Sequence, residues 1–228
     1  MACPARALEF CPGEDAGRAG GDPSRLPTTA QVAPARRTIC HARENSDAVP
    51  IVCSGWAAAF TTLPDGRKQI LSFLLPGDAV SLAYLFEPMY GRTIEAVTDV
   101  TYRTFKRSDI KAKVFQNPRS FEMLSQLWME ERRQAEESML DLGRRTASGR
   151  LARCILALAQ KLEKRGMMPG RTMAFPLRQH HLADASGLTP VHVCKVLGEF
   201  QRDGLIGIDG RTLTLIDAAA LRRAADLI

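Results

Sequence analysis

This sequence lacks the features that mark several common classes of protein. No apolar run reaches about 18 residues, which excludes a membrane-spanning helix. The N-terminus has no long apolar core of a secretory signal, so we expect a cytoplasmic protein. The six cysteines form no CxxC pair, and their separations fit no zinc template.

Catalytic patterns are missing as well. Only four histidines are present, and three of them fall after residue 179. No paired carboxylates, nucleophile–base set or phosphate-binding loop stands out. We therefore expect a protein that is not an enzyme and that holds no metal ion or cofactor.

What the sequence has in excess is positive charge, and that charge is unevenly placed. Residues 144–228 hold 14 Lys and Arg against 7 Asp and Glu, whereas residues 1–143 hold 17 against 18. A basic segment beside a neutral one predicts a polyanion-binding module joined to another domain. The alternative interpretation is a basic, solvated surface with no such partner.

The N-terminal half predicts an irregular segment followed by a β domain. Residues 1–33 are rich in Ala, Gly, Pro and Arg without a period, which predicts an atypical, disordered N-terminus. Residues 34–116 alternate short apolar runs with turn signals, as in a β-roll. The segments 64–66 (Pro-Asp-Gly) and 76–78 (Pro-Gly-Asp) predict turns, and Gly55 and Gly77 suit tight corners with positive φ.

Two helices are expected next. The first covers 117–143 and carries an apolar stripe, which favours dimerisation through a partial coiled-coil seam over a solvent-facing linker helix. The stripe consists of Phe121, Leu124, Leu127, Trp128, Ala135, Met139 and Leu142. The second helix opens the C-terminal domain, 144–228. It places apolar residues at spacings of 4, 3 and 4 and is expected to end near Gly166: Leu151, Ile155, Leu158 and Leu162.

The stretch LADASGLTPVHVCKVLGEF, residues 182–200, has the pattern of a helix-turn-helix. Ala183 is small enough for the close approach of two helices, and Gly187 tolerates the left-handed φ of the turn. Thr189 suits the N-cap of the second helix, and Pro190 suits its first position. The small core between the helices is predicted from Leu182, Leu188, Val193 and Val196.

A wing is predicted after this motif, and together they indicate double-stranded DNA as the partner. GLIGIDGRTLTLID holds two β-runs around Asp209-Gly210, a dipeptide typical of a type I′ hairpin. We expect the helix 190–203 to enter the major groove by its N-terminal end; the alternative is a helical subdomain that binds protein. The candidate DNA-binding residues are Arg178, Gln179, Thr189, Pro190, Val191, His192, Cys194, Lys195 and Arg211.

A β-roll, a long helix and a C-terminal winged helix-turn-helix in this order resemble the CRP/FNR family of bacterial transcription regulators. The resemblance covers Pro34 to Asp217 and is carried by VCSGWAAAF, LPDGRKQILSFLLPGD, GRLARCILAL and HLADASGLTPVHVCKVLGEFQRDGLI. It implies an α+β fold with a cyclic-nucleotide-binding-like roll, a homodimer on a two-fold symmetric DNA site, and RNA polymerase as a candidate further partner. The sequence is most similar to the FixK-like branch.

Departures from the family pattern bear on the signal that the protein senses. Arg92 and Thr93 match the pair that holds the phosphate of cyclic AMP and are effector-site candidates. Leu82 stands where a ribose-binding glutamate is expected, and Ser81 replaces the glycine before it. A ribose hydroxyl facing leucine would lose its acceptor, at a cost of about 1–3 kcal/mol, so we expect no cyclic-AMP binding. We expect Arg92 to form a surface or inter-strand ion pair instead.

Other departures concern the cysteines, the N-terminus and the reader helix. Cys3 and Cys11 are too far apart for the family's iron–sulfur cluster. Arg43 replaces a turn glycine before Glu44, and the irregular residues 1–33 replace the usual leading segment, which together predict an incomplete roll with exposed strand edges. The family's base-reading glutamate is absent from the reader helix, which predicts an unusual half-site.

Three alternatives stay open at this point. The first is a cyclic-nucleotide-responsive regulator of the same fold. The second is a redox-responsive one acting through Cys40, Cys53 or Cys194, set against inert packed thiols. The third is an inactive paralogue with a damaged N-terminus.

Overall fold

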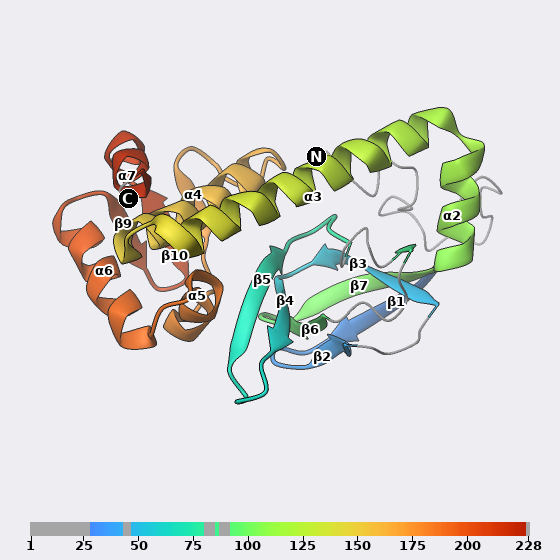
Figure 1. The fold of residues 1–228 in the computed structure, drawn as a ribbon, viewed down its shortest axis with the longest axis horizontal. Coiled ribbons are helices and arrows are strands. Elements are labelled where there is room, and N and C mark those ends of the chain that lie inside the picture. The colour runs from blue at the N-terminus through green and yellow to red at the C-terminus, as the bar shows by residue number, and fades with distance from the viewer. Residues whose placement is uncertain (1–27, 43–46, 80–84, 87–91, 227–228) are drawn as a thin grey trace. The chain divides into compact units, whose positions relative to one another are not determined.

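The computed structural model describes residues 28–42, 47–79, 85–86 and 92–226. The chain divides into two compact units. One is formed by the described residues up to 132 except 68–70, and the other by residues 133 onward together with 68–70. The boundary falls inside the long helix α3, Pro118–Arg144, which contributes one half to each unit (Figure 1).

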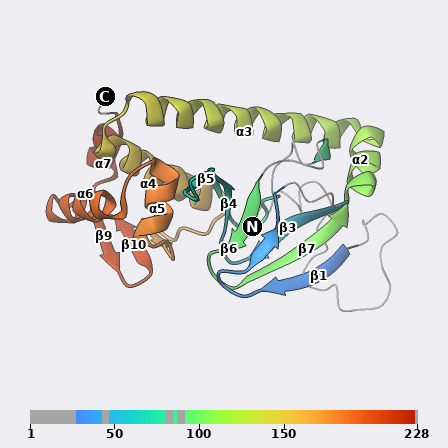
Figure 2. The ribbon, with the colours of Figure 1, turned by 60° about the horizontal axis from the view of Figure 1, so that its bottom comes forward.

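The first unit is a roll of two antiparallel sheets. One sheet has the order β1-β7-β3 (Figure 2), and the other has the order β2-β6-β4-β5 (Figure 1). The strands are β1 Thr28–Ala33, β2 Thr38–Cys40, β3 Ala48–Ser54, β4 Ala57–Thr62, β5 Lys68–Leu74, β6 Thr93–Ala96 and β7 Val100–Lys106. This arrangement confirms the β-roll predicted from the short apolar runs.

The strand β1 corrects the prediction for the N-terminus. Residues 28–33 lie in the segment 1–33 that was predicted to be disordered, yet they pair along β7 from Thr28–Phe105 to Ala33–Val100. The Tyr102 hydroxyl donates to Oε1 of Gln31 at 2.5 Å. This strand covers one edge of β7, so that edge is not exposed as the prediction of an incomplete roll implied. Residues 1–27, with Cys3 and Cys11, and the Arg43–Glu44 corner lie outside the described residues.

Glycines with positive φ form the predicted corners of the roll. Gly66 (φ 84°) lies in the turn between β4 and β5, and Gly77 (φ 94°) follows β5. Gly55 (φ 83°) joins β3 to β4, where an added Cβ would come within 2.1 Å of the Asp99 carbonyl oxygen. No side chain fits at that distance, so the tight corner requires glycine.

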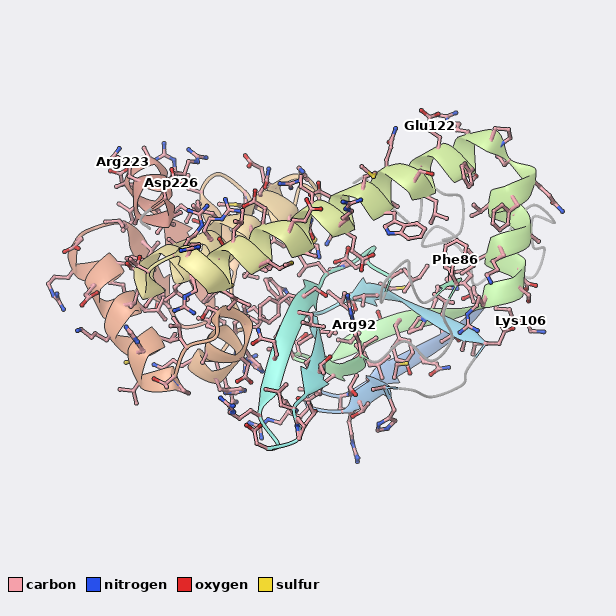
Figure 3. All side chains as sticks on the ribbon, in the orientation of Figure 1. Phe86, Arg92, Lys106, Glu122, Arg223 and Asp226 are labelled. Atoms are coloured by element: carbon pink, nitrogen blue, oxygen red, sulfur yellow. The ribbon has the colours of Figure 1, made fainter. Side chains whose placement is uncertain are left out.

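Two helices close the core of the roll. Helix α2, Arg107–Gln116, buries Ile110 and Val114 against the sheets, and α3 adds Leu124. Phe86 stacks on Trp128 of α3 with ring centroids 5.7 Å apart (Figure 3). The first half of α3 is therefore part of the roll's own core.

The apolar residues of α3 do not form the single dimer seam that was predicted, because some face the roll and others are exposed. Leu124 is buried and Leu127 packs against the roll core, while Phe121, Trp128 and Met139 are at least half exposed. The prediction placed all of these residues on one dimer seam, and it was wrong for the two leucines. The reason is that these two leucines pack against the core of the roll in the same chain, so they are not available to a second chain.

The second unit is a small helical domain with a three-stranded sheet. Its helices pack in the order α4 with α5, α6 and α7, and its sheet has the order β8-β10-β9. The bounds are α4 Ala147–Glu163, β8 Thr172–Ala174, α5 Gln179–Ser186, α6 Pro190–Arg202, β9 Ile206–Asp209, β10 Thr212–Leu215 and α7 Ala218–Ala225. Among the described residues, no helix is both long and apolar enough to cross a membrane.

The core of this unit confirms the spacing found in the sequence. The four residues predicted on α4 are all buried, and Gly166 (φ 67°) lies just past the helix end. Helix α7 was not predicted, although its signals are present. Asp217 caps it by accepting from the Ala220 N–H at 2.9 Å, and Leu221 and Ala225 bury one face.

Candidate DNA interface

The turn between α5 and α6 has the geometry predicted for a helix-turn-helix. Gly187 ends α5 in the left-handed region, with φ 64° and ψ 38°, and its N–H donates to the Ala183 carbonyl. The Leu188 N–H donates to the same carbonyl at 3.0 Å. Ala183 is fully buried where the two helices meet. Both the small residue and the glycine are thus required by the close packing and by the backbone.

The start of α6 is fixed by its own sequence. The Thr189 Oγ1 accepts from the His192 N–H at 3.2 Å, which satisfies one of the free donors of the first turn. Pro190 occupies the first helical turn, where no backbone donor is needed. The helix ends at Arg202, one residue before the predicted end at residue 203.

Helix α6 has a buried face and a free N-terminal end. Its apolar residues Val193, Val196, Leu197 and Phe200 are buried. Val191 has 80% of its surface exposed, and His192, Cys194 and Lys195 are exposed as well. The remaining candidates from the sequence are also exposed: Arg178, Gln179, Thr189, Pro190 and Arg211.

A groove of about 630 Å³ brings several of these candidates together. It lies between the start of α5, helix α6 and the hairpin of β9 and β10. Its lining includes Arg178, Gln179, Pro190 and Cys194, but not Val191, His192 or Lys195. Sequence reasoning missed Gly198 and Gln201, which also line it. Their signal was the helical spacing of 194, 198 and 201, which places all three on one face.

The hairpin of β9 and β10 forms the predicted wing with a different turn. Asp209 pairs with Thr212, so the two loop residues are Gly210 and Arg211. Gly210 has φ 54°, whereas Arg211 has no positive φ. A type I′ turn needs positive φ at both loop residues, so the predicted turn type was wrong. The hairpin itself is confirmed, and exposed Arg211 stands at its tip.

Local hydrogen bonds and charges order the side chains around this surface. The Arg178 N–H donates to Nδ1 of His181 at 3.0 Å, which caps the start of α5. The His180 and His181 rings lie 4.0 Å apart. Lys195 Nζ lies 4.0 Å from Oε1 of Glu199, one turn along α6. Such an exposed pair contributes about 0.3–0.5 kcal/mol, so a phosphate or a base can displace it.

The effector-site candidates lie in the roll and contact protein groups. Arg92 forms an ion pair with Glu131 of α3, at 3.5 Å from Nη1 to Oε1 (Figure 3). Thr93 Oγ1 accepts from the Ala42 N–H at 3.2 Å. Arg92 thus forms an ion pair, but its partner lies on helix α3, whereas a surface or inter-strand pair was expected. Ser81 and Leu82 lie outside the described residues.

The four described cysteines differ in their surroundings. Cys40 is buried, Cys53 and Cys154 are half-buried, and Cys194 is exposed. Burial, with a smaller effect from the charge of Asp141, raises the pKa of Cys154 to about 12. The Cys154 thiol is therefore protonated and unreactive at neutral pH. Within the described part of the chain, no group of three or more His, Cys, Asp or Glu could hold a metal ion.

Comparison with known proteins supports this interpretation of the surface. Residues 149–224 match the Crp-like helix-turn-helix domain, and residues 30–117 match the cyclic nucleotide-binding domain. The transcriptional activator protein FnrL of Cereibacter sphaeroides is 29% identical over 234 residues, covering 98% of this chain and 91% of that protein. The nitrogen fixation regulation protein FixK of Azorhizobium caulinodans is 31% identical over 179 residues, covering 77% of this chain and 70% of that protein.

A solved structure matches both units in one alignment. The structure of FixK2 from Bradyrhizobium japonicum has a TM-score of 0.79 and 28% identity, covering 89% of this chain and all of that chain. The order of roll, long helix and winged helix-turn-helix is thus shared with FixK proteins. The chain belongs to the CRP/FNR family of transcription regulators, and its similarity to FixK proteins supports the FixK-like branch.

Proposed function

We propose that this protein is a sequence-specific DNA-binding transcription regulator that acts as a homodimer on a two-fold symmetric site. The observation that carries the proposal is the free N-terminal end of α6. It is capped by Thr189 and followed by exposed side chains, while the opposite face of the helix is buried. A helix held in this way enters the major groove by that end. No catalytic role is proposed.

The side chains at this end have chemistry suited to base edges. Lys195 can donate to O6 and N7 of guanine, and Val191 can contact a thymine methyl group. His192 is exposed in the first turn of α6 and can donate to a base or a phosphate. Pro190 and Cys194 add apolar surface on the groove side of the helix.

Phosphate contacts are proposed for the residues around α6. The Thr189 hydroxyl proton is not used by the helix cap, so it can donate to a phosphate together with the N–H groups of the helix start. Arg178 and Gln179 at the start of α5 line the groove, and Arg211 at the wing tip follows Gly210, which lines it from the hairpin. The positive charge of residues 144–228 supplies the long-range attraction.

Dimerisation is proposed through the exposed side of α3. Met139 has 73% of its surface exposed in the single chain, and Phe121, Trp128, Met129 and Leu140 are also at least half exposed. Apolar residues along one helix are covered when two such helices pack together. Regulators of this family bind DNA and act as dimers, which supports the same arrangement.

The proposed half-site differs from that of typical family members. Val191 stands where the family places a glutamate that accepts from cytosine N4, and valine has no acceptor. Preference for cytosine at the corresponding position is therefore expected to be lost. We also propose that the protein acts in the cytoplasm, where bacterial DNA lies, and that it contacts RNA polymerase, as befits a relative of the activator FnrL.

A binding selection from a random duplex pool at a stated salt concentration tests the proposal. We expect a symmetric motif with half-sites about one helical turn apart. Salt-sensitive binding without any sequence preference would contradict it. A recovered motif of the standard TTGAT or TGTGA type would overturn the unusual half-site alone.

The dimer is tested separately by sedimentation equilibrium. Met139→Glu places a charge on the proposed interface and should shift the protein to monomer. Gln134→Glu adds the same charge on the opposite side of α3 and is the matched control. A Met139→Glu variant that stays dimeric, or a wild-type protein that is monomeric, would exclude this interface.

A further inference from the structure

A cluster of ion pairs joins the end of α3 to the DNA-binding unit. Asp141 Oδ1 accepts from Nε of Arg145 at 2.7 Å and lies 3.5 Å from Nε of Arg153 on α4. Arg153 also pairs with Glu137, one turn earlier on α3, at 2.5 Å. Two carboxylates of α3 thus hold one arginine of α4.

The same cluster reaches the C-terminal helix. Nη1 of Arg145 donates to the Ala225 carbonyl at 2.6 Å, at the last turn of α7. The same nitrogen lies 3.8 Å from the carboxylate of Asp226, which Figure 3 labels at the end of α7. Asp141 is therefore the acidic centre of a connection among three helices: α3, α4 and α7.

The Asp141–Arg145 pair at the centre of this cluster is shielded from water, unlike most surface ion pairs, whereas Asp226 at its edge is exposed. The side chains of Asp141 and Arg145 are only 19% and 16% exposed. For comparison, Arg67 and Asp65 in the β4–β5 turn show the same 2.7 Å distance but are 78% and 49% exposed. Shielding strengthens the attraction between the charges and raises the penalty for removing one of them.

A second attachment lies at the turn of the helix-turn-helix. Leu142 of α3 packs over Gly187, where an added Cβ would come within 2.9 Å of its Cδ2. Nη1 of Arg150 donates to the Ser186 carbonyl at 3.3 Å and lies 3.5 Å from that of Gly187. The end of α3 therefore contacts the DNA-binding unit at two separate places: α4 and α7 through the ion pairs, and the turn before α6 through Leu142. Arg150 joins α4 to the same turn.

We infer that Asp141 is a positioning residue that fixes the orientation of the DNA-reading helix on α3 and so sets the spacing between half-sites. The inference rests on the proposed dimeric DNA binding, because only a dimer reads a spacing. Adding one base pair moves the second half-site by about 3.4 Å and rotates it by about 35°. A DNA-reading helix that is held to α3 at two places cannot shift to meet the displaced half-site, whereas a less firmly held helix can.

Asp141→Asn tests the inference because it removes the charge and keeps the shape. The half-site recovered by selection is placed in duplexes with the selected spacing and with one base pair more or fewer. Fluorescence anisotropy then gives the affinity ratio between these spacings. We expect Asp141→Asn to reduce that ratio by about threefold or more, with the affinity for a single half-site unchanged.

Asp65→Asn is the matched control, because it breaks an arginine–carboxylate pair of equal length in the roll. It should leave the spacing ratio at the wild-type value. Melting temperatures measured for both variants identify the temperature range in which all proteins are folded. A uniform loss of affinity in Asp141→Asn, with an unchanged ratio, would show a merely structural role and overturn the inference.

Failure of the proposed function has a different outcome. A wild-type protein that binds no duplex with two half-sites overturns both the dimeric function and the positioning role. A wild-type protein with a clear spacing preference that Asp141→Asn retains overturns the positioning role alone.

Discussion

Replacing Gly187 by alanine probes the most constrained point of the DNA-reading unit. Two effects add at this position. The first is the left-handed backbone, φ 64°, which costs an L-residue about 1–2 kcal/mol. The second is the new Cβ, which would lie 2.9 Å from Cδ2 of Leu142. Displacing the end of that flexible side chain costs about 1 kcal/mol more, at the low end for overpacking.

Gly204 provides the matched control in the same unit. Its φ is 70°, and nothing lies within 4 Å of an added Cβ. Gly204→Ala should therefore show the backbone effect alone. For a unit of this size about 1 kcal/mol corresponds to about 4–8 °C in melting temperature, so Gly187→Ala should melt about 4–8 °C below Gly204→Ala.

A double-mutant cycle separates the two effects. In the Leu142→Ala background Cδ2 is absent, so Gly187→Ala should cost no more than Gly204→Ala. The coupling between positions 142 and 187 should then be about 1 kcal/mol. Equal melting temperatures for the two single alanine variants, or the absence of coupling, would refute the contact between α3 and the turn.

Three further results are expected. Thr189→Ala should lower the free energy of unfolding by about 1 kcal/mol through loss of the helix cap, which denaturant unfolding measures. It should also weaken DNA binding, which fluorescence anisotropy measures. A thiol reagent at pH 8 should modify exposed Cys194 in the folded protein and leave Cys154, with its pKa of about 12, unmodified; mass spectrometry of peptides from the labelled protein checks this. Hydrogen bonding from the Ala220 N–H lowers the pKa of Asp217, so its stabilisation is present above the unfolded-state pKa of about 3.9 and is lost as the pH falls through the lower folded value. The melting-temperature advantage of wild type over Asp217→Ala should therefore shrink in acid, and a constant advantage would contradict the role of the charge.

The parts of the fold that the sequence predicted are those with local signals. Gly187, Thr189 and Pro190 lie within four residues. Gly187 forms the turn, Thr189 caps α6, and Pro190 begins that helix. The leucines of α4 follow one helical period, so their burial depends on spacing alone. Local chemistry of this kind does not need the rest of the chain to be known.

The parts that the sequence did not predict depend on distant residues. Strand β1 is fixed by pairing with β7 more than 65 residues away, and its own residues give no strong strand signal. Which apolar residues of α3 are buried depends on the roll, because Leu124 packs in the roll core. Asp141 carried no motif at all, because its partners at Arg153 and its link to Ala225 arise only when α3, α4 and α7 meet.

The central claim, that the start of α6 reads base pairs, is tested most directly by repeating the duplex selection with Lys195→Ala. The predicted result is a motif in which one base-pair preference is lost, at symmetric positions in both half-sites, while the other positions keep theirs. Lys164→Ala, which removes an exposed lysine just after α4, should leave the motif unchanged. A Lys195→Ala motif identical to that of wild type, or one weakened equally at every position, would contradict the claim that this residue reads a base.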